Sequence, residues 1–296
     1  MTQQQVLALG FFDGVHLGHG VLLRSCRELA DRLGVTAAAL TFDTHPDTLV
    51  TGKTPGLINS PADREKLMLE RFRLDRVLTL HFDEAMMHTP WQDFFRLLLD
   101  TYHAAGLVCG HDFRFGDRGA GNAEILSAAC REAGIPCIVV PEQKLDGITV
   151  SSTHIRALLE QGDMAAASRF LGHPHILTGT VIRGRQLGRT WGIPTANLIL
   201  PEGVLAPRLG VYACRTWVDG KAYAAVTNVG TRPTVGGHQC RVEAWLLDFE
   251  GDLYGRELTL EFLEFLRPET KFPSSVALQA EIRKNAEQTR EFFAKN

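Results

Sequence analysis

Apolar residues in the first 150 positions form short runs, and amphipathic stretches with a helical repeat separate these runs. Short buried strands that alternate with helices are typical of a parallel sheet covered by helices and joined by right-handed crossovers. The predicted strands are residues 6–9, 35–42, 77–82, 107–109 and 135–140. In such a sheet a ligand binds beyond the carboxyl ends of the strands, so the loops that follow the strands are expected to carry the chemistry.

Polar residues, glycine and proline mark the ends of several predicted helices. The stretch 21–33 has one apolar face, and Gly34 follows it as a left-handed C-cap would. Pro61 suits the first position of a second helix. Thr89 and Gln92 have the spacing of a capping box and predict the start of a third helix.

The hydrophobic pattern changes near residue 175, where an alternation of apolar and polar positions replaces the helical repeat. Residues 211–218 and 222–229 flank Asp219-Gly220, a dipeptide that strongly favours a tight β-hairpin. Several short antiparallel strands of this kind predict a small barrel or sandwich.

These two patterns predict two domains, residues 1–172 and residues 173–296. The stretch 152–171 that leads from one to the other is predicted to be helical, and a last helix is predicted to begin at Ser274 or Ser275. A chain of 296 residues is long enough to bury a core in each half. The fold class is therefore an α/β parallel-sheet domain followed by a small antiparallel β domain with a C-terminal helix.

Composition narrows the class of protein. The formal net charge of −3 and the isoelectric point of about 6.4 argue against a nucleic-acid-binding surface, which needs a basic excess. The N-terminus has no positive region before its first apolar run, and no apolar stretch is as long as a membrane span, so neither a signal peptide nor a membrane partner is expected. The six cysteines are scattered without a C-x-x-C pair, which indicates free thiols and a cytoplasmic protein.

A turn rich in glycine and histidine, residues 10–19, joins the first predicted strand to the first helix. His16 and His19 lie at the helix N-terminus, where unpaired N–H groups and the helix dipole favour an anion, and Gly18 leaves room for a phosphate. Zinc would need further ligands at recognisable spacing, and no suitable Cys or His follows. A phosphate site and an ordinary polar loop both remain open from these residues alone.

Three further segments are predicted to reach the same edge of the sheet. His45 follows the second strand, and the segment 110–116 follows the fourth, with Gly121-Asn122 just beyond it. Ser151, Ser152 and Arg156 stand at a helix start and could cradle a pyrophosphate. Each segment alone could be only a turn or a helix cap.

The second half carries a glycine-rich segment that includes Gly184 and Gly188 and could cradle phosphates. Thr195 and Asn197, in the sequence PTAN, could supply hard oxygen ligands to Mg²⁺. This is not a Walker A loop: the match that ends in Gly52-Lys53-Thr54 has Asp47 where the first glycine is required.

Glu243 is a candidate general base in the second half, because a carboxylate can take a proton from a substrate hydroxyl. The alternative is a glutamate on the solvated face of a strand, and the alternation of apolar and polar residues by itself favours that alternative.

Taken together, the motifs resemble the bacterial bifunctional riboflavin kinase/FMN adenylyltransferase family, also called FAD synthetases. The matching stretches run in the family's order over almost the whole chain: FFDGVHLGHG, TFDTHP, GHDFRFG, VSSTHIR, GRTWGIPTANL, GVYA, NVGTRPTVGG, VEAWLLDFEGDLYG and LRPETKF. The H-x-G-H motif marks a superfamily, whereas PTAN with NVGTRPT is far more specific. Two positions depart from the family pattern: Thr44 replaces a common Pro, and Asn285 replaces a frequent acid.

The resemblance implies a Rossmann-like nucleotidyltransferase domain followed by a small antiparallel β-barrel. It also implies two ATP-dependent reactions. The C-terminal domain would phosphorylate riboflavin to FMN with Mg²⁺, releasing ADP, and the N-terminal domain would transfer AMP from a second ATP to FMN, giving FAD and pyrophosphate. Positioning and charge neutralisation supply most of the catalysis in such phosphoryl transfer.

The resemblance further implies a role for each candidate residue. His16 and His19 would stabilise charge at the α-phosphate of ATP, and Glu243 would be the base in the kinase reaction. The remaining ATP-binding residues of the adenylyltransferase would be Gly10, Phe11, Asp13, Gly18, Asn122, Ser151, Ser152 and Arg156. The kinase would bind ATP and flavin through Gly184, Gly188, Thr195, Asn197 and Arg232, with Thr195 and Asn197 at the metal.

Two other classes of protein stay open at this point. A different adenylyltransferase could act on pantetheine phosphate or nicotinamide mononucleotide, although PTAN and RPT argue against it. A non-enzymatic flavin-binding protein could keep the same fold, although His16, His19 and Glu243 are intact. The sequence leaves the oligomeric state, flavin channelling and the preferred flavin redox state undetermined.

Overall fold

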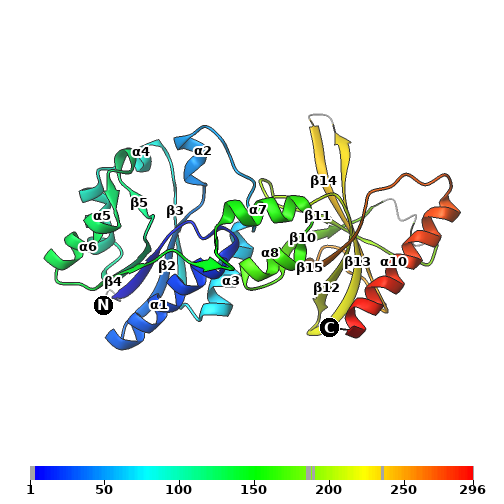
Figure 1. Ribbon diagram of the computed structural model, residues 1–296, viewed down its shortest axis with the longest axis horizontal. Helices are drawn as coiled ribbons and strands as arrows, with labels where there is room; N and C mark the ends of the chain where they lie inside the picture. The colour runs from blue at the N-terminus through cyan, green and yellow to red at the C-terminus, as the bar shows by residue number, and fades with distance from the viewer. Residues whose placement is uncertain (1–3, 185–187, 189–190, 235–236, 296) are drawn as a thin grey trace. The chain divides into compact units, whose positions relative to one another are not determined.

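The structure is a computed structural model that describes residues 4–184, 188, 191–234 and 237–295, without the side chains of 232–239 (Figure 1). The chain divides into two compact units. The first comprises Met1–Leu57 and Pro61–Ser152, and the second comprises Ile58–Ser60 and Thr153–Asn296. Each unit is described by itself below.

The first unit is built on a parallel sheet of five strands in the order β3-β2-β1-β4-β7. These strands are β1 (Gln5–Leu9), β2 (Thr36–Phe42), β3 (Arg76–Leu80), β4 (Ala104–Gly110) and β7 (Cys137–Val140). The chain order reverses between β1 and β4, which is the place where open parallel sheets bind their ligands. The predicted α/β parallel fold is therefore confirmed.

Helices cover both faces of this sheet. The main ones are α1 (Leu17–Leu33), α3 (Pro61–Phe72), α5 (Trp91–Asp100) and α6 (Ala123–Glu132). Leu7 packs with α5 and α6, whereas Val6 packs with α1 and α3, because successive side chains of a strand point to opposite faces. Shorter elements complete the unit: η1 (Asp13–Val15), α2 (Pro46–Val50), α4 (Glu84–Met87), β5 (Arg114–Phe115), η2 (Asp117–Gly119), β6 (Gly121–Asn122), β8 (Lys144–Leu145) and β9 (Ile148–Thr149).

One predicted helix start is wrong. Thr89 does not form a capping box, because its hydroxyl donates to the Ala85 carbonyl of the preceding α4 at 2.9 Å. Pro90 is the N-cap of α5 and has no side-chain cap bond. The Gly34 prediction is confirmed: this residue ends α1 in the left-handed conformation at φ 68°.

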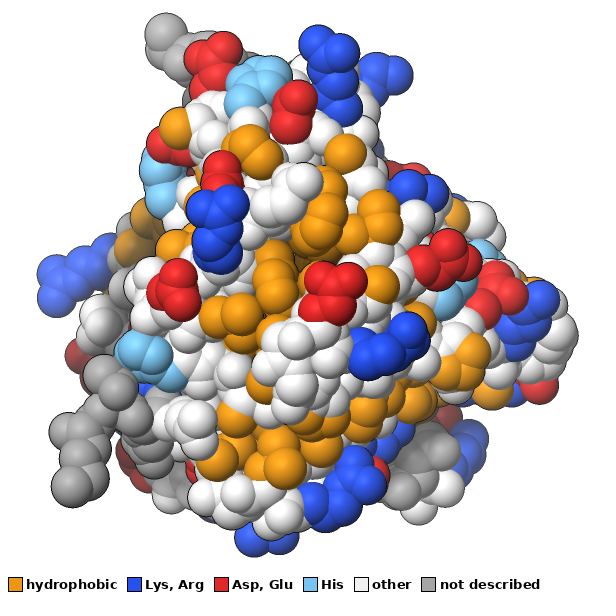
Figure 2. All heavy atoms as spheres, turned by 90° about the vertical axis from the view of Figure 1, so that its left-hand side faces the viewer, with side chains coloured by type: hydrophobic (Ala, Val, Ile, Leu, Met, Phe, Trp, Pro, Cys, Tyr) orange, Lys and Arg blue, Asp and Glu red, His pale blue; other side chains and the backbone are white. Residues whose placement is uncertain are grey.

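Figure 2 views the molecule from the side on which α5 and α6 lie. Lys and Arg side chains on this face are interspersed with Asp and Glu, and hydrophobic side chains gather in the middle of the view. Neither sign of charge dominates the visible face.

The second unit is a closed antiparallel barrel with strand order β10-β11-β14-β13-β12-β15, which decides between the predicted barrel and sandwich. The strands are β10 (His175–Ile182), β11 (Ala196–Ile199), β12 (Gly210–Val218), β13 (Lys221–Thr234), β14 (Gly237–Leu246) and β15 (Glu257–Pro268). The predicted hairpin joins β12 to β13, with Asp219 and Gly220 both at positive φ, as a type I′ turn requires.

The described helices that accompany the barrel are α7 (Ser152–Gln161), α8 (Met164–Leu171) and α10 (Ser275–Lys295). The Ser274 hydroxyl accepts from the Ala277 N–H, so Ser274 is the cap predicted for the last helix. Ala286 of α10 packs on Val211 and Val226, which lie on the outer face of the barrel. On β14, Val242 and Ala244 fill the barrel interior, so Glu243 between them faces outward.

All six cysteines are free thiols, as predicted. Four of them are buried, while Cys137 and Cys240 are half-buried.

His175 is a buried titratable group at the start of β10. Its side chain is fully buried near Phe262, and within the described residues neither ring nitrogen has a hydrogen-bond partner. Burial, with a contribution from the nearby His173, lowers the pKa of His175 from 6.5 to about 3. The folded barrel therefore keeps this imidazole neutral at a pH where the unfolded chain protonates it.

We expect His175 to destabilise the barrel in acid. Above pH 6.5 the ring is neutral in both the folded and the unfolded chain, so it adds no pH dependence. As the pH falls from 6.5 toward 3, the free energy of unfolding falls by about 1.4 kcal/mol per pH unit, because only the unfolded chain takes up the proton. His175→Leu should flatten the pH dependence of the unfolding midpoint between pH 6 and pH 4, measured by urea titration with tryptophan fluorescence. The same slope in both proteins would show that another group governs acid unfolding.

Candidate active sites

A cavity of about 630 Å³ lies at the carboxyl ends of β1, β2, β4 and β7 in the first unit. Its lining brings together the segments that the sequence predicted to converge: the turn after β1, His45, the residues after β4, and Ser151 with Ser152. The two histidines of the turn, His16 and His19, both line it. The position agrees with the β1/β4 reversal of strand order.

The two imidazoles are packed against each other at the start of α1. Their ring centroids are 3.5 Å apart, and the His16 Nδ1 accepts a hydrogen bond from the His19 backbone N–H at 3.2 Å. A Cβ at Gly18 would lie 3.2 Å from the His16 ring, so a larger residue there would push this ring aside. Phe12 meets the other ring edge-on at 5.3 Å and holds positive φ. The turn thus fixes both rings.

His19 is kept neutral in this arrangement. Burial holds its pKa well below 6.5, and the neighbouring charges of His16 and Arg64 lower it further. Its Nδ1 is buried and has no hydrogen-bond partner among the described residues. An anion in the cavity would oppose these effects and favour a proton on the ring.

Arg64 is a charged residue of this region that the sequence analysis missed. It lies in the first turns of α3 with 2% of its surface exposed, and its Nη2 donates to the Phe42 carbonyl at 2.8 Å. Its guanidinium lies 4.2 Å from the Phe11 ring centroid, and the charges of Asp13 and Asp43 oppose the effect of burial on its pKa. The sequence signal that could have identified Arg64 is its position four residues before Met68, which places an arginine on the apolar face of the helix.

The other predicted ATP-binding residues differ in where they lie. Those that line the cavity are Gly10, Phe11, Gly18, Ser151 and Ser152. Asp13 is buried under the turn, and its carbonyl accepts from the Ser152 hydroxyl at 2.9 Å. Asn122 is not among the lining residues and instead caps α6 by accepting from the Ile125 N–H, as the helix-cap alternative allowed. Arg156 belongs to the second unit.

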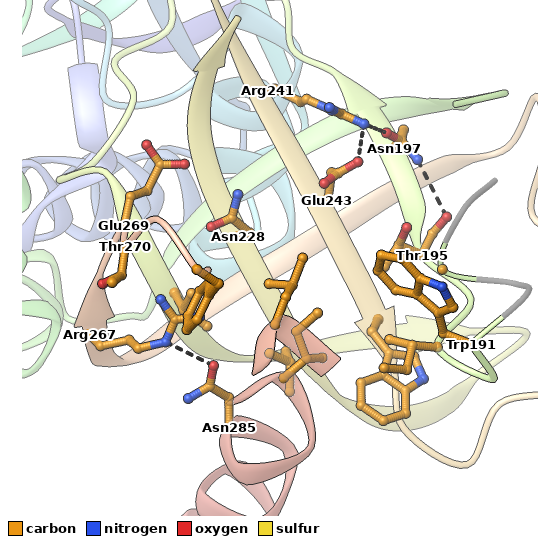
Figure 3. Close-up of a pocket in the computed structure, with 18 residues that line it drawn as sticks. Trp191, Thr195, Asn197, Asn228, Arg241, Glu243, Arg267, Glu269, Thr270 and Asn285 are labelled. Carbon is orange, nitrogen blue, oxygen red and sulfur yellow. Dashed lines mark hydrogen bonds and ion pairs between the residues drawn. The ribbon is translucent and has the colours of Figure 1, made fainter. Parts of the chain in front are cut away.

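A second cavity, of about 380 Å³, lies against the outer wall of the barrel and beside α10 (Figure 3). The strand register places three residues at the centre of this cavity. Asn197 of β11 is directly opposite Glu243 of β14, and Glu243 is directly opposite Asn228 of β13. Three polar side chains therefore form one row across three neighbouring strands on the face that points into the cavity.

Glu243 does not lie on a solvated face, because only 25% of its side chain is exposed. Arg241, two residues earlier on the same face of β14, donates through Nη2 to Glu243 Oε1 and, at 2.9 Å, to Asn197 Oδ1. Burial raises the pKa of the Glu243 carboxyl, and the Arg241 charge opposes that rise. A partly buried carboxylate of this kind is a better base than an exposed one.

The glycines of this region allow the chain to close over Asn197. A Cβ at Gly184 would lie 2.6 Å from the Asn197 side-chain amide, and Gly188 approaches the Ile193 carbonyl too closely for any side chain. Gly188, Thr195 and Asn197 line the cavity. The side chain of Arg232 lies outside the described residues.

Thr195 and Asn197 fit a magnesium ion only as part of its ligand set. Their side chains carry hard oxygens, and Glu243 adds a carboxylate nearby. Among the described residues there is no group of three or more His, Cys, Asp or Glu that could hold a metal. Magnesium with so few protein ligands depends on substrate phosphates for the rest.

A third cavity, of about 360 Å³, shares Thr195 with the second. Its wall includes Pro194, Ala196, Asp252 and Tyr254. Thr195 therefore borders both cavities, whereas Ala196 and Ala244 of the third cavity lie on the opposite strand face from Asn197 and Glu243.

Arg267 and Asn285 line the other end of the second cavity. Arg267 Nε donates to Asn285 Oδ1 at 3.0 Å and lies 3.6 Å from Glu281. Asn285 is fully buried and also donates to Gln288 at 3.1 Å. Its amide therefore serves as acceptor and donor at once, while Glu281 supplies the negative charge beside Arg267, which explains why this departure from the family pattern is tolerated.

Comparisons with known proteins agree with the division of the chain into two units. The FAD synthetase profile matches residues 1–154, and the riboflavin kinase profile matches residues 171–293. The bifunctional riboflavin kinase/FMN adenylyltransferase of Listeria monocytogenes is 33% identical over 98% of this chain and 93% of its own length. The enzyme of the same name from Haemophilus influenzae is 37% identical over 99% and 96%, and that of Escherichia coli is 36% identical over 97% and 92%.

A solved structure is also similar over the whole chain. A crystal structure described as a macrolide-efflux protein from Streptococcus pneumoniae matches with a TM-score of 0.86 and 31% identity, covering 98% of this chain and 95% of that one. Within the described residues of this chain, no helix combines the length and apolar character needed to cross a membrane. From the two profiles and the full-length relatives, we conclude that the chain belongs to the bifunctional riboflavin kinase/FMN adenylyltransferase family.

Proposed function

We propose that this protein phosphorylates riboflavin to FMN at the barrel cavity and converts FMN to FAD at the cavity of the parallel sheet. ATP is the second substrate in both reactions, with ADP released in the first and pyrophosphate in the second. The observation that carries the proposal is the row Asn197–Glu243–Asn228, which sets a partly buried carboxylate between two side-chain amides in the wall of the barrel cavity.

In the kinase reaction, Glu243 accepts the proton of the ribityl 5′-hydroxyl. The hydroxyl oxygen then forms a bond to the γ-phosphorus of ATP, the bond from that phosphorus to ADP breaks, and ADP leaves. Thr195 and Asn197 would hold a magnesium ion, which supplies neutralisation of phosphate charge when it is bound. Asn228, opposite Glu243, is placed to orient the hydroxyl.

In the adenylyltransferase reaction, an FMN phosphate oxygen attacks the α-phosphorus of ATP, and the bond from that phosphorus to pyrophosphate breaks. His16 and His19 face the α-phosphate and stabilise the charge that develops on its oxygens. Ser151 and Ser152 hold the β- and γ-phosphates at a helix start. FMN phosphate is itself the nucleophile, so a covalent enzyme intermediate is unnecessary.

The direct test is one incubation of the protein with riboflavin, ATP and Mg²⁺, followed by chromatography. FMN should accumulate first and FAD after it. Supply of FMN in place of riboflavin should give FAD with pyrophosphate and no ADP. Absence of both flavin products from folded protein would favour a non-enzymatic flavin-binding protein. The free thiols fit a reducing compartment, and we place the protein in the cytoplasm.

We expect the two activities to reside in separable fragments, as the predicted domains 1–172 and 173–296 imply, although the compact units divide after Ser152. The buried face of α8, which includes Phe170 and Leu171, packs on β10 and β15. Exposing each large side chain costs about 1.5–3 kcal/mol, so a fragment 153–296 should melt at a higher temperature than a fragment 173–296. Both should form FMN from riboflavin wherever they are folded.

The kinase activity of each fragment should be measured below the melting temperature of that fragment. A folded 153–296 fragment without kinase activity would contradict the assignment of the kinase to this part of the chain. Equal melting temperatures would instead place the stability boundary at residue 172.

A further inference from the structure

Arg241 stands at the centre of the barrel site. One nitrogen of its guanidinium, Nη2, donates both to Asn197 Oδ1 and to Glu243 Oε1 (Figure 3). The three residues come from two neighbouring strands, with Asn197 of β11 opposite Glu243 of β14. A single positive group therefore joins an amide oxygen and a carboxylate oxygen that point toward the same place.

The Asn197 amide oxygen is a hard ligand of the type that a magnesium ion takes, and Asn197 is one of the two residues proposed to hold the metal. The guanidinium and the metal would compete for the same lone pairs of Asn197 Oδ1. In the substrate-free protein the Arg241 charge also compensates for the burial of Glu243.

The hydrogen bond from Arg241 to Asn197 is of a kind that can open when a metal binds and form again when it leaves. The Arg241 side chain is 37% exposed, and the contact that has to open is one hydrogen bond from its guanidinium to the neutral amide of Asn197. A bound metal with its phosphates can therefore displace the guanidinium from Asn197.

A second carboxylate is available on the opposite side of β14. Across the β13–β14 ladder, Arg241 is opposite Gly230. A Cβ at Gly230 would collide with the Glu269 carboxylate, so this carboxylate lies directly over the glycine. Since β14 lies between β11 and β13, a guanidinium that leaves Asn197 can move toward Glu269 without leaving the cavity that both residues line.

We propose that Arg241 is a positioning residue of the kinase site, whose guanidinium holds Asn197 and Glu243 in the substrate-free protein and gives up Asn197 to magnesium when the nucleotide binds. This inference rests on the proposed kinase function of the barrel. It makes Arg241 a competitor of magnesium, so that the metal requirement of nucleotide binding depends on a residue that is not itself a metal ligand.

The test uses the full chain and ADP as the probe, with binding measured by calorimetry over a series of Mg²⁺ concentrations. Arg241→Gln should reach half-maximal ADP binding at a Mg²⁺ concentration about two- to tenfold lower than the wild type, as expected for the loss of one hydrogen bond that competes with the metal. Arg241→Lys keeps the charge without the planar fork and should fall between the two. It also serves as the test variant if the glutamine variant fails to fold.

Arg215→Gln is the matched control, since Arg215 pairs with Glu261 at 2.7 Å on strands of the same barrel and does not line the cavity. Its Mg²⁺ dependence should equal that of the wild type. An unchanged Mg²⁺ dependence in folded Arg241→Gln would overturn the proposal. So would a hundredfold fall in kinase kcat with unchanged Mg²⁺ dependence of ADP binding, because Arg241 would then act on the transferring phosphate.

Glu243→Gln separates this failure from failure of the proposed function. If that variant loses kinase activity while Arg241→Gln binds ADP as the wild type does, only the role of Arg241 is wrong. If Glu243→Gln keeps full kinase activity, the catalytic assignment on which the inference rests is wrong.

Discussion

Glu243→Gln should lower the rate of riboflavin phosphorylation by ~10²–10⁴-fold, the usual contribution of a positioned proton acceptor. Glutamine keeps the shape of the side chain and can still accept a hydrogen bond from Arg241, but it cannot take the proton of the ribityl hydroxyl. The protein should therefore stay folded and still bind riboflavin. Conversion of supplied FMN to FAD should continue, since that reaction is assigned to the other compact unit.

Glu261→Gln provides the control for this prediction. Glu261 is also a strand glutamate paired with an arginine, Arg215, but it does not line the cavity. A coupled assay for ADP should show near-normal riboflavin kinase turnover in that variant. Near-normal turnover in Glu243→Gln as well would leave the kinase without an assigned base and make the Glu243–Arg241 pair a structural one.

The fold was largely predictable because its signals are local. Gly34 ends α1 and the Asp219-Gly220 turn sets the β12–β13 hairpin, and both act through the backbone conformation of one or two residues. The predicted capping box at Thr89 was wrong because its hydroxyl had a nearer acceptor in α4, a short helix with no buried residue and therefore little hydrophobic pattern. Residues 104–106 of β4 were missed because Ala-Ala-Gly has too little apolar bulk to mark a strand.

The two candidate sites differ in how far the sequence leads to them. In the first unit, parallel strands bring their carboxyl ends to one edge, so motifs that follow strands could be placed together without coordinates. In the barrel, the row of Asn197, Glu243 and Asn228 depends on the register of antiparallel strands, and the local sequence does not fix that register between β11 and β14. Arg241 and Asn228 were missed for this reason.

The other large effect expected is on FAD formation. His19→Ala should slow adenylyl transfer to FMN by ~10²–10³-fold, because it removes an electrostatic group aimed at the α-phosphate. The ring also stacks on His16 at 3.5 Å, so its loss removes the packing that orients the second imidazole. Riboflavin supplied with ATP should then be converted to FMN, which accumulates in place of FAD.

His88→Ala is the matched control for His19→Ala, because His88 is an exposed histidine of the same unit that pairs with Asp117 and does not line the cavity. Time courses of FMN and FAD by chromatography, with riboflavin as the starting flavin, report both activities in one reaction. The control should give wild-type amounts of both products. An equal loss of FMN and FAD formation in folded His19→Ala would contradict the assignment of this histidine to adenylyl transfer, because its ring packs on Phe12 and His16, both of the first unit.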